Sequence, residues 1–125
     1  MKRVPNPEET ETASLMDYAL VALAQLGGTA TKDQIVEHVG VVFKDQLTSA
    51  DRVPVYTGPD GKTAFVPPGY TGGTWEAWGG KTKAALLNAI YKRGLIEYHK
   101  GGACSLTEVG LKRVAMLAEN WLNSK

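Results

Sequence analysis

The stretch Lys81–Thr107, KTKAALLNAIYKRGLIEYHKGGACSLT, decides which fold the sequence predicts. Residues 81–93 hold four basic residues and no acid, and their apolar residues recur at helical spacing. Gly94 follows, and glycine commonly ends helices because it adopts the left-handed backbone conformation without strain. The spacing therefore predicts a helix over residues 81–93, with one apolar side and one basic side.

The two sides of this helix differ in chemistry. The side expected to be buried carries three apolar residues: Leu86, Leu87 and Ile90. At about 100° per residue, the opposite side carries two lysines and an amide: Lys81, Asn88 and Lys92. Lysines commonly contact phosphates, and an asparagine can pair with adenine in the major groove of DNA. The helix therefore suits DNA, with a merely solvated helix face as the alternative.

The residues after Gly94 predict a two-stranded hairpin. Residues 95–99 alternate as a strand does, Gly101-Gly102 supplies the positive φ angles of a tight turn, and residues 103–106 return. Thr107 can then cap another helix. A helix, a hairpin and a helix in this order form the second half of a winged helix-turn-helix.

The first forty residues predict the other half. Residues 1–11 are expected to form a flexible tail, which leaves residues 12–125 as one domain. A helix is expected from about Thr12 to Leu26. A second helix is expected to begin after Thr31, which has capping-box spacing with Gln34.

An insert separates the two halves, at about residues 41–80. Two β-prone runs flank the turn signal GPDGK at residues 58–62, which predicts an inserted hairpin or loop. Its aromatic residues could stack on an extruded base, but a small local core is the interpretation that we favour. A long last helix is expected from about Glu108 to Asn123. Its apolar face is wide enough to predict a homodimer interface at Leu117, Trp121 and Leu122.

Composition places the chain among ordinary globular proteins. It has 125 residues, of which 43% are hydrophobic and 22% charged. No run is long enough to span a membrane, and the first residues lack the apolar stretch of a signal peptide, so we expect a cytoplasmic protein. The single cysteine, Cys104, excludes an internal disulfide and is expected to be a small buried residue.

The net charge of +1 conceals an uneven distribution. Residues 81–125 contain eight basic and three acidic residues, a net charge of +5 that leaves −4 on residues 1–80. The basic balance thus lies where the helix and hairpin are predicted. The residues expected to contact DNA are Lys81, Lys83, Asn88, Lys92, Arg93, His99 and Lys100.

Two runs of the sequence resemble a known family. These are ALVALAQLGGTATKDQIVEHVG at residues 19–40 and KTKAALLNAIYKRGLIEYHKGGACSLTEVGLKRV at residues 81–114. They are similar to winged helix-turn-helix domains, most of all to the N-terminal domain of Mrr-type restriction endonucleases. The resemblance implies a DNA-binding domain of α+β class. The turn at residues 58–62 departs from the family pattern, and no nuclease domain follows the second run, so we expect binding without cleavage.

The sequence offers no catalytic or metal site. It contains no CxxC or HExxH motif, and no nucleophile stands at local spacing from a base. We therefore expect a non-enzymatic protein without a cofactor, which binds double-stranded DNA as a bacterial or phage regulator or as a stand-alone recognition subunit. The alternative is a protein–protein adaptor or dimerisation module that uses the same fold.

Overall fold

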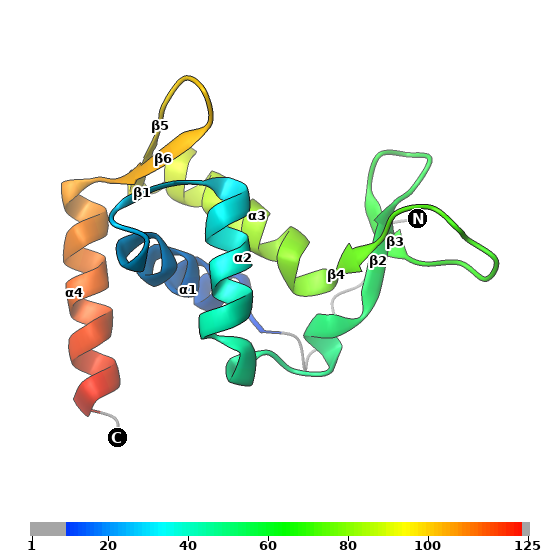
Figure 1. The fold of residues 1–125 in the computed structure, drawn as a ribbon, viewed down its shortest axis with the longest axis horizontal. Coiled ribbons are helices and arrows are strands. Elements are labelled where there is room, and N and C mark those ends of the chain that lie inside the picture. The colour runs from blue at the N-terminus through cyan, green and yellow to red at the C-terminus, as the bar shows by residue number, and fades with distance from the viewer. Residues whose placement is uncertain (1–9, 124–125) are drawn as a thin grey trace.

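The computed structural model describes residues 10–123, with side chains as far as Asn120. Within this range the chain is of α+β class, with helices and two small antiparallel sheets (Figure 1). In chain order the elements are α1 (Thr12–Gln25), β1 (Thr29–Thr31), α2 (Lys32–Val42), the 3-10 turns η1 (Lys44–Gln46) and η2 (Ala50–Arg52), β2 (Pro54–Thr57), β3 (Thr63–Phe65), β4 (Trp75–Glu76), α3 (Ala77–Tyr91), β5 (Ile96–Tyr98), β6 (Ala103–Leu106) and α4 (Glu108–Asn123).

The main core lies where α1, α2 and α3 meet. Apolar residues at helical spacing turn one side of each helix inward, and each buried leucine contributes about 1.5–3 kcal/mol. The core residues of these helices include Leu20, Leu23, Ile35, Val39, Leu86 and Ala89. Helix α4 lies against α1, and Val114 packs on the edge of this core.

The first sheet joins the N-terminal helices to the C-terminal hairpin. Its strand order is β1-β6-β5, and Ala30 of β1 pairs with Cys104 of β6. Cys104 is fully buried, as the sequence predicted, and burial raises the pKa of its thiol. Strand β1 was not predicted, because three residues are too few to show the alternation that indicates a strand.

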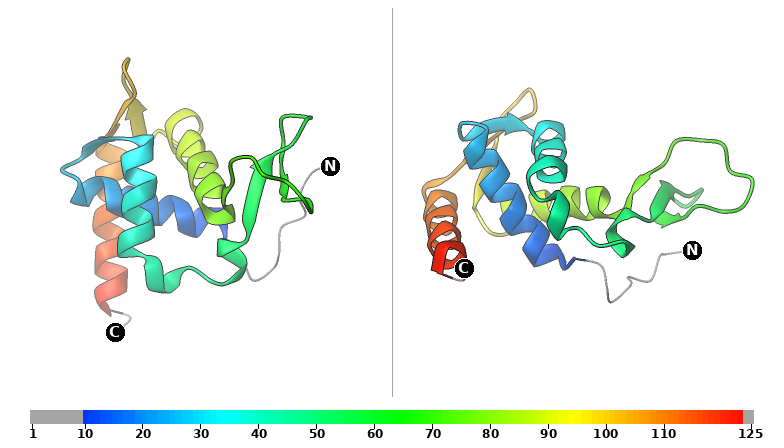
Figure 2. Two further views of the ribbon diagram at one scale, coloured as in Figure 1. Left: turned by 45° about the vertical axis from the view of Figure 1, so that its right-hand side comes forward. Right: turned by 60° about the horizontal axis from the view of Figure 1, so that its bottom comes forward.

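The insert forms a second sheet with the strand order β3-β2-β4. We call residues 53–76, which contain this sheet, the arm. The arm projects away from the helices, and α3 runs from it to the β5–β6 hairpin (Figures 1 and 2). The predicted hairpin around GPDGK is present as β2 and β3, with Val55 paired with Phe65. The two-residue strand β4 was not predicted.

Helix α3 begins four residues before the predicted start. An earlier start was not predicted, because glycine has a low helix propensity and the sequence has Gly79-Gly80 just before Lys81. Tertiary contacts outweigh that preference: the Trp78 ring lies against Gly40 of α2, and the Thr82 hydroxyl donates to the Trp78 carbonyl at 2.7 Å. The helix ends at Tyr91, two residues before the predicted end, with Lys92 as its C-cap, and Gly94 follows with a φ of +63°.

The structure differs from the sequence predictions at Thr10 and Leu87. Residues 1–9 lie outside the described residues. Thr10 is fixed, because its backbone N–H donates to Asp51 Oδ1 at 2.6 Å. Leu87 was expected to be buried, and this expectation is wrong: 45% of the residue is exposed. Ala85 and Ala89 fill the buried side of α3 in its place.

Candidate nucleic-acid interface

Helix α3 has three exposed sides, and its predicted DNA contacts are divided between the two flanks. The outward face carries Leu87 and Tyr91, and 71% of Tyr91 is exposed. Lys83 lies on the flank toward α2, as its ion pair with Asp33 shows. The other flank carries the side that we predicted as the reading face: Lys81, Asn88 and Lys92. Helices α1 and α2 cover the part of α3 that lies between the predicted apolar side and the predicted reading face. The predicted reading face therefore lies on a flank of α3 and does not point directly away from the core.

Two contacts join the flank toward α2 to the hairpin. The Lys83 Nζ lies 3.3 Å from Asp33 Oδ1, near the start of α2. The neighbouring Lys32 places its Nζ 5.2 Å from the centroid of the Tyr98 ring on β5, within cation–π range. We call the surface formed by Lys32, Asp33, Lys83, Leu87, Tyr91, Tyr98 and Lys100 the helix–hairpin surface. The Lys83–Asp33 and Lys32–Tyr98 contacts connect α3, the start of α2 and the hairpin.

The hairpin itself has the predicted turn. Gly101 and Gly102 both have φ +101°, a conformation that side-chain-bearing residues rarely adopt. The His99 Nε2 lies 2.9 Å from Ser105 Oγ, which holds the ring against β6. Lys100 is exposed at the tip, so of these two predicted contacts the lysine is the better placed to reach a phosphate.

Lys81 is engaged within the chain. Its Nζ donates to the Thr10 carbonyl at 2.6 Å, and the residue is half-buried. The sequence could not predict this bond, since its partner lies 71 residues away. Lys81 is therefore poorly placed for the DNA contact that we predicted.

Asn88, Lys92 and Arg93 line an open cleft between α1, α3 and α4, with a volume of about 660 Å³. Arg113 of α4 completes its basic wall and binds Asp17 of α1 through Nε at 3.1 Å and Nη2 at 2.9 Å. Hydrogen bonding to Asp17 raises the pKa of Arg113, which keeps the guanidinium charged. This cleft could not be predicted from the sequence, because its walls come from three separate regions of the chain.

The arm carries a row of apolar side chains. Trp75 and Phe65 both pair with Val55, so the three side chains lie on one face of the sheet. Val55 is fully buried, whereas Trp75 and Phe65 are 37% and 49% exposed. The Trp75 ring lies close to Gly80 at the start of α3, and the row thus leads toward the outward face of that helix.

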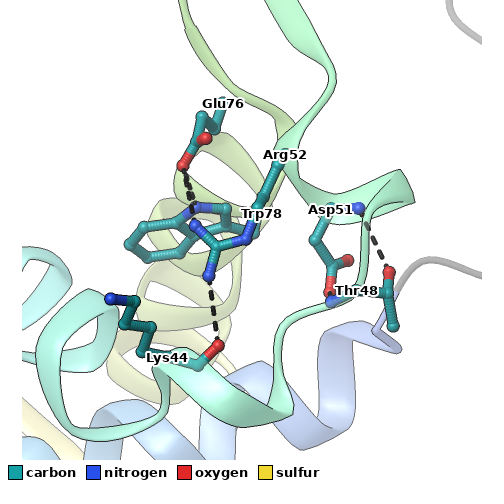
Figure 3. Close-up of polar contacts among 6 residues, drawn as sticks. All are labelled: Lys44, Thr48, Asp51, Arg52, Glu76 and Trp78. Carbon is teal, nitrogen blue, oxygen red and sulfur yellow. Dashed lines mark hydrogen bonds and ion pairs between the residues drawn. The ribbon is translucent and has the colours of Figure 1, made fainter.

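Polar contacts fix the arm to the helices (Figure 3). Arg52 donates through Nη2 to the Lys44 carbonyl at 3.1 Å, and its Nη1 lies 3.8 Å from Glu76 Oε1. The same Glu76 oxygen accepts the Trp78 indole N–H at 2.9 Å. Both ends of the arm are thereby tied to the start of α3, which gives the arm a defined position beside that helix.

The predicted dimer residues lie in α4. Leu117 is buried within the chain, so it does not supply an exposed apolar side chain. The side chains of Trp121 and Leu122 lie outside the described residues. Among the side chains of α4 that the structure describes, the large apolar ones that are exposed are instead Val109, Leu111 and Met116.

Comparisons with known proteins do not place the chain in a family. No family model, no curated protein and no solved structure gives a match. Among residues 10–123, no helix has both the length and the apolar character needed to cross a membrane. In the same range, no three His, Cys, Asp or Glu side chains are grouped to hold a metal ion.

Proposed function

We propose that the protein is a winged helix-turn-helix that binds duplex DNA without catalysis, through the helix–hairpin surface. The order α1-β1-α2-α3-β5-β6 supports this assignment, as does the sheet order β1-β6-β5. Helix α3 would be the reading helix and the β5–β6 hairpin the wing. The arm is then an addition between α2 and α3, and it leaves the order of the other elements unchanged.

One observation carries the proposal: α3, the start of α2 and the hairpin each carry a lysine, and two contacts connect these three elements. Lys83 and Lys32 lie on the flank of α3 toward α2, and Lys100 lies at the hairpin tip. In a docked complex these lysines would contact phosphates beside the groove that α3 enters. Leu87 and Tyr91 would then face base edges, where an apolar side chain can contact a thymine methyl group.

The dependence of affinity on salt tests this proposal. Each phosphate contact releases counterions and contributes about 0.9 to the slope of log K against log salt, so three lysines predict a slope of roughly −3. Lys32→Gln and Lys100→Gln should each reduce its magnitude by about one. The measurement is the fluorescence anisotropy of a labelled random-sequence duplex at several salt concentrations.

Lys112→Gln is the matched control for these variants. Lys112 lies on α4, outside the proposed surface, and its Nζ is 3.7 Å from Glu108 Oε1. Its replacement should leave the slope unchanged. Absence of binding at low salt, or equal slope changes in all three variants, would contradict the proposed interface.

A protein–protein adaptor is the second candidate, and the apolar character of the exposed surface favours it. Leu87 and Tyr91 occupy the outward face of α3, and Trp75 leads toward them from the arm. Contiguous exposed apolar residues commonly mark protein interfaces. An adaptor would bind no DNA, so the anisotropy experiment separates the two functions.

We also propose a homodimer, with α4 as its interface. Val109 and Met116 lie on the same side of this helix and are each at least half exposed, and exposed apolar side chains favour association. Met116→Asp should convert the dimer to monomers, because an unpaired charge opposes burial. Light scattering at micromolar concentration checks this, and a monomer mass for the unmodified protein would exclude the dimer.

A further inference from the structure

We propose that the cleft between α1, α3 and α4 binds a small organic anion, with a carboxylate or phosphate group on an apolar body. This inference is independent of DNA binding, since it rests on the shape and charge of the cleft alone. The lining residues are Thr12, Ala13, Met16, Asp17, Asn88, Lys92, Arg93, Leu95 and Arg113.

The charge of the cleft favours an anion. Among the described residues that line it, three are cationic and Asp17 is the only acid. Asp17 is occupied by Arg113, while Lys92 and Arg93 form no ion pair with any residue of the described part of the chain. An anion entering the cleft would therefore meet two uncompensated positive charges, which attract a carboxylate or phosphate most strongly in a partly enclosed site.

Arg113 is oriented before any ligand arrives. Its Nε and Nη2 both donate to Asp17, so the plane of the guanidinium is fixed by two bonds. The Nη1 donors are not used by this pair and remain available for an anion. A side chain fixed in advance loses little conformational entropy on binding, which increases affinity.

The remaining lining favours a ligand with an apolar body. Ala13, Met16 and Leu95 supply apolar wall, and Met16 and Leu95 are each 8% exposed because they also belong to the core. The volume of about 660 Å³ is in the usual range of about 300–1,000 Å³ for small-molecule sites. Inorganic phosphate alone would leave most of this space and all of the apolar wall without contacts.

Titration with three probes tests the inference by ¹⁵N–¹H correlation NMR of the whole chain. The probes are 2-naphthoate, the neutral 2-naphthamide and inorganic phosphate. We expect 2-naphthoate to give saturable shifts at the backbone amides of Ala13, Met16, Lys92 and Arg93. It should bind at least tenfold more tightly than the amide, which lacks the charge, and more tightly than phosphate, which lacks the apolar body.

The double variant Lys92→Gln/Arg93→Gln removes both uncompensated charges. Both residues are exposed, so the fold should persist, and the NMR spectrum shows directly whether it does. Affinity for 2-naphthoate should fall at least tenfold. The matched control is Lys100→Gln/Lys112→Gln, which removes two charges outside the cleft and should leave affinity unchanged. Unsaturable or dispersed shifts, equal binding of the amide, or unchanged affinity in the cleft variant would overturn the proposal.

Discussion

Gly110→Ala is expected to lower the free energy of unfolding by about 3 kcal/mol, the upper part of the usual range for overpacking. A Cβ atom at this position would lie 2.1 Å from the Leu95 carbonyl oxygen and 3.1 Å from Leu106 Cδ2. The carbonyl cannot move freely, because it accepts the Thr107 backbone N–H at 3.1 Å. Thr107 in turn caps α4 by accepting the Gly110 N–H. The substitution should therefore separate α4 from the start of β5, and urea denaturation measures the loss.

Gly79→Ala is the matched control for Gly110→Ala. Gly79 also lies in a helix, α3, but a Cβ there would meet no atom within 4 Å. The intrinsic preference of alanine for helix should then raise the free energy of unfolding, by up to about 1 kcal/mol. Equal effects of the two substitutions would show that helix propensity decides the result and that the close approach of α4 does not.

The second large effect is expected at Asp51, where the arm meets the helices. Asp51 is fully buried, and its carboxylate accepts the Thr10 backbone N–H at 2.6 Å, the Thr10 hydroxyl at 2.5 Å and the Thr48 backbone N–H at 2.8 Å. Asp51→Ala leaves these donors without their acceptor. Since hydrogen bonds to charged groups contribute about 1.5–3 kcal/mol each, a total loss of about 3 kcal/mol is expected, even if some donors find water.

The same carboxylate should make stability depend on acid pH. Burial acts to raise the pKa of Asp51, but the hydrogen bonds from Thr10 and Thr48 outweigh it and lower the pKa below its usual value. The contribution of Asp51 is therefore fully present above the pKa of about 3.9 in the unfolded chain, and it is lost as the pH falls through the folded-state pKa. Thermal unfolding between pH 7 and pH 2 measures this loss, which should be smaller in Asp51→Ala.

Asp60 provides the control for the pH experiment. The backbone N–H of Lys62 lowers the pKa of Asp60 as well, but this carboxylate is exposed at the tip of the arm. Water can replace the bond, so Asp60→Asn should leave both stability and its pH dependence nearly unchanged. An identical acid-side loss in the unmodified protein and in Asp51→Ala would exclude Asp51 as its source.

Short-range patterns in the sequence determined much of the local structure. Thr31 and Gln34 form the predicted capping box, with the Gln34 N–H donating to Thr31 Oγ1 at 3.2 Å and the Thr31 N–H to Gln34 Oε1 at 2.9 Å. Gly94 ends α3, and Gly101-Gly102 forms the hairpin turn. These features were predictable because each depends on residues only a few positions apart, through side-chain capping or through the freedom of glycine.

The faces of α3 were decided by tertiary structure. Helical spacing fixes the angles between Leu86, Leu87 and Asn88, but it does not determine which neighbouring helix covers which side. In the folded chain α1 and α2 cover the side with Ala85 and Ala89, so that Leu87 faces outward. Alanines had given too weak an apolar signal to indicate this, although their small size is what lets the helices approach closely.

The distribution of usable charge was also decided by tertiary structure. The sequence alone placed a net charge of +5 in residues 81–125. Folding brings Asp17 to Arg113 and Asp33 to Lys83, and it gives Lys81 a carbonyl partner at Thr10. These partners lie 50 to 96 residues away, and opposite charges pair by distance in space and not in sequence. Composition thus determined how much positive charge this region holds, and the fold determined which groups lie beside each cation.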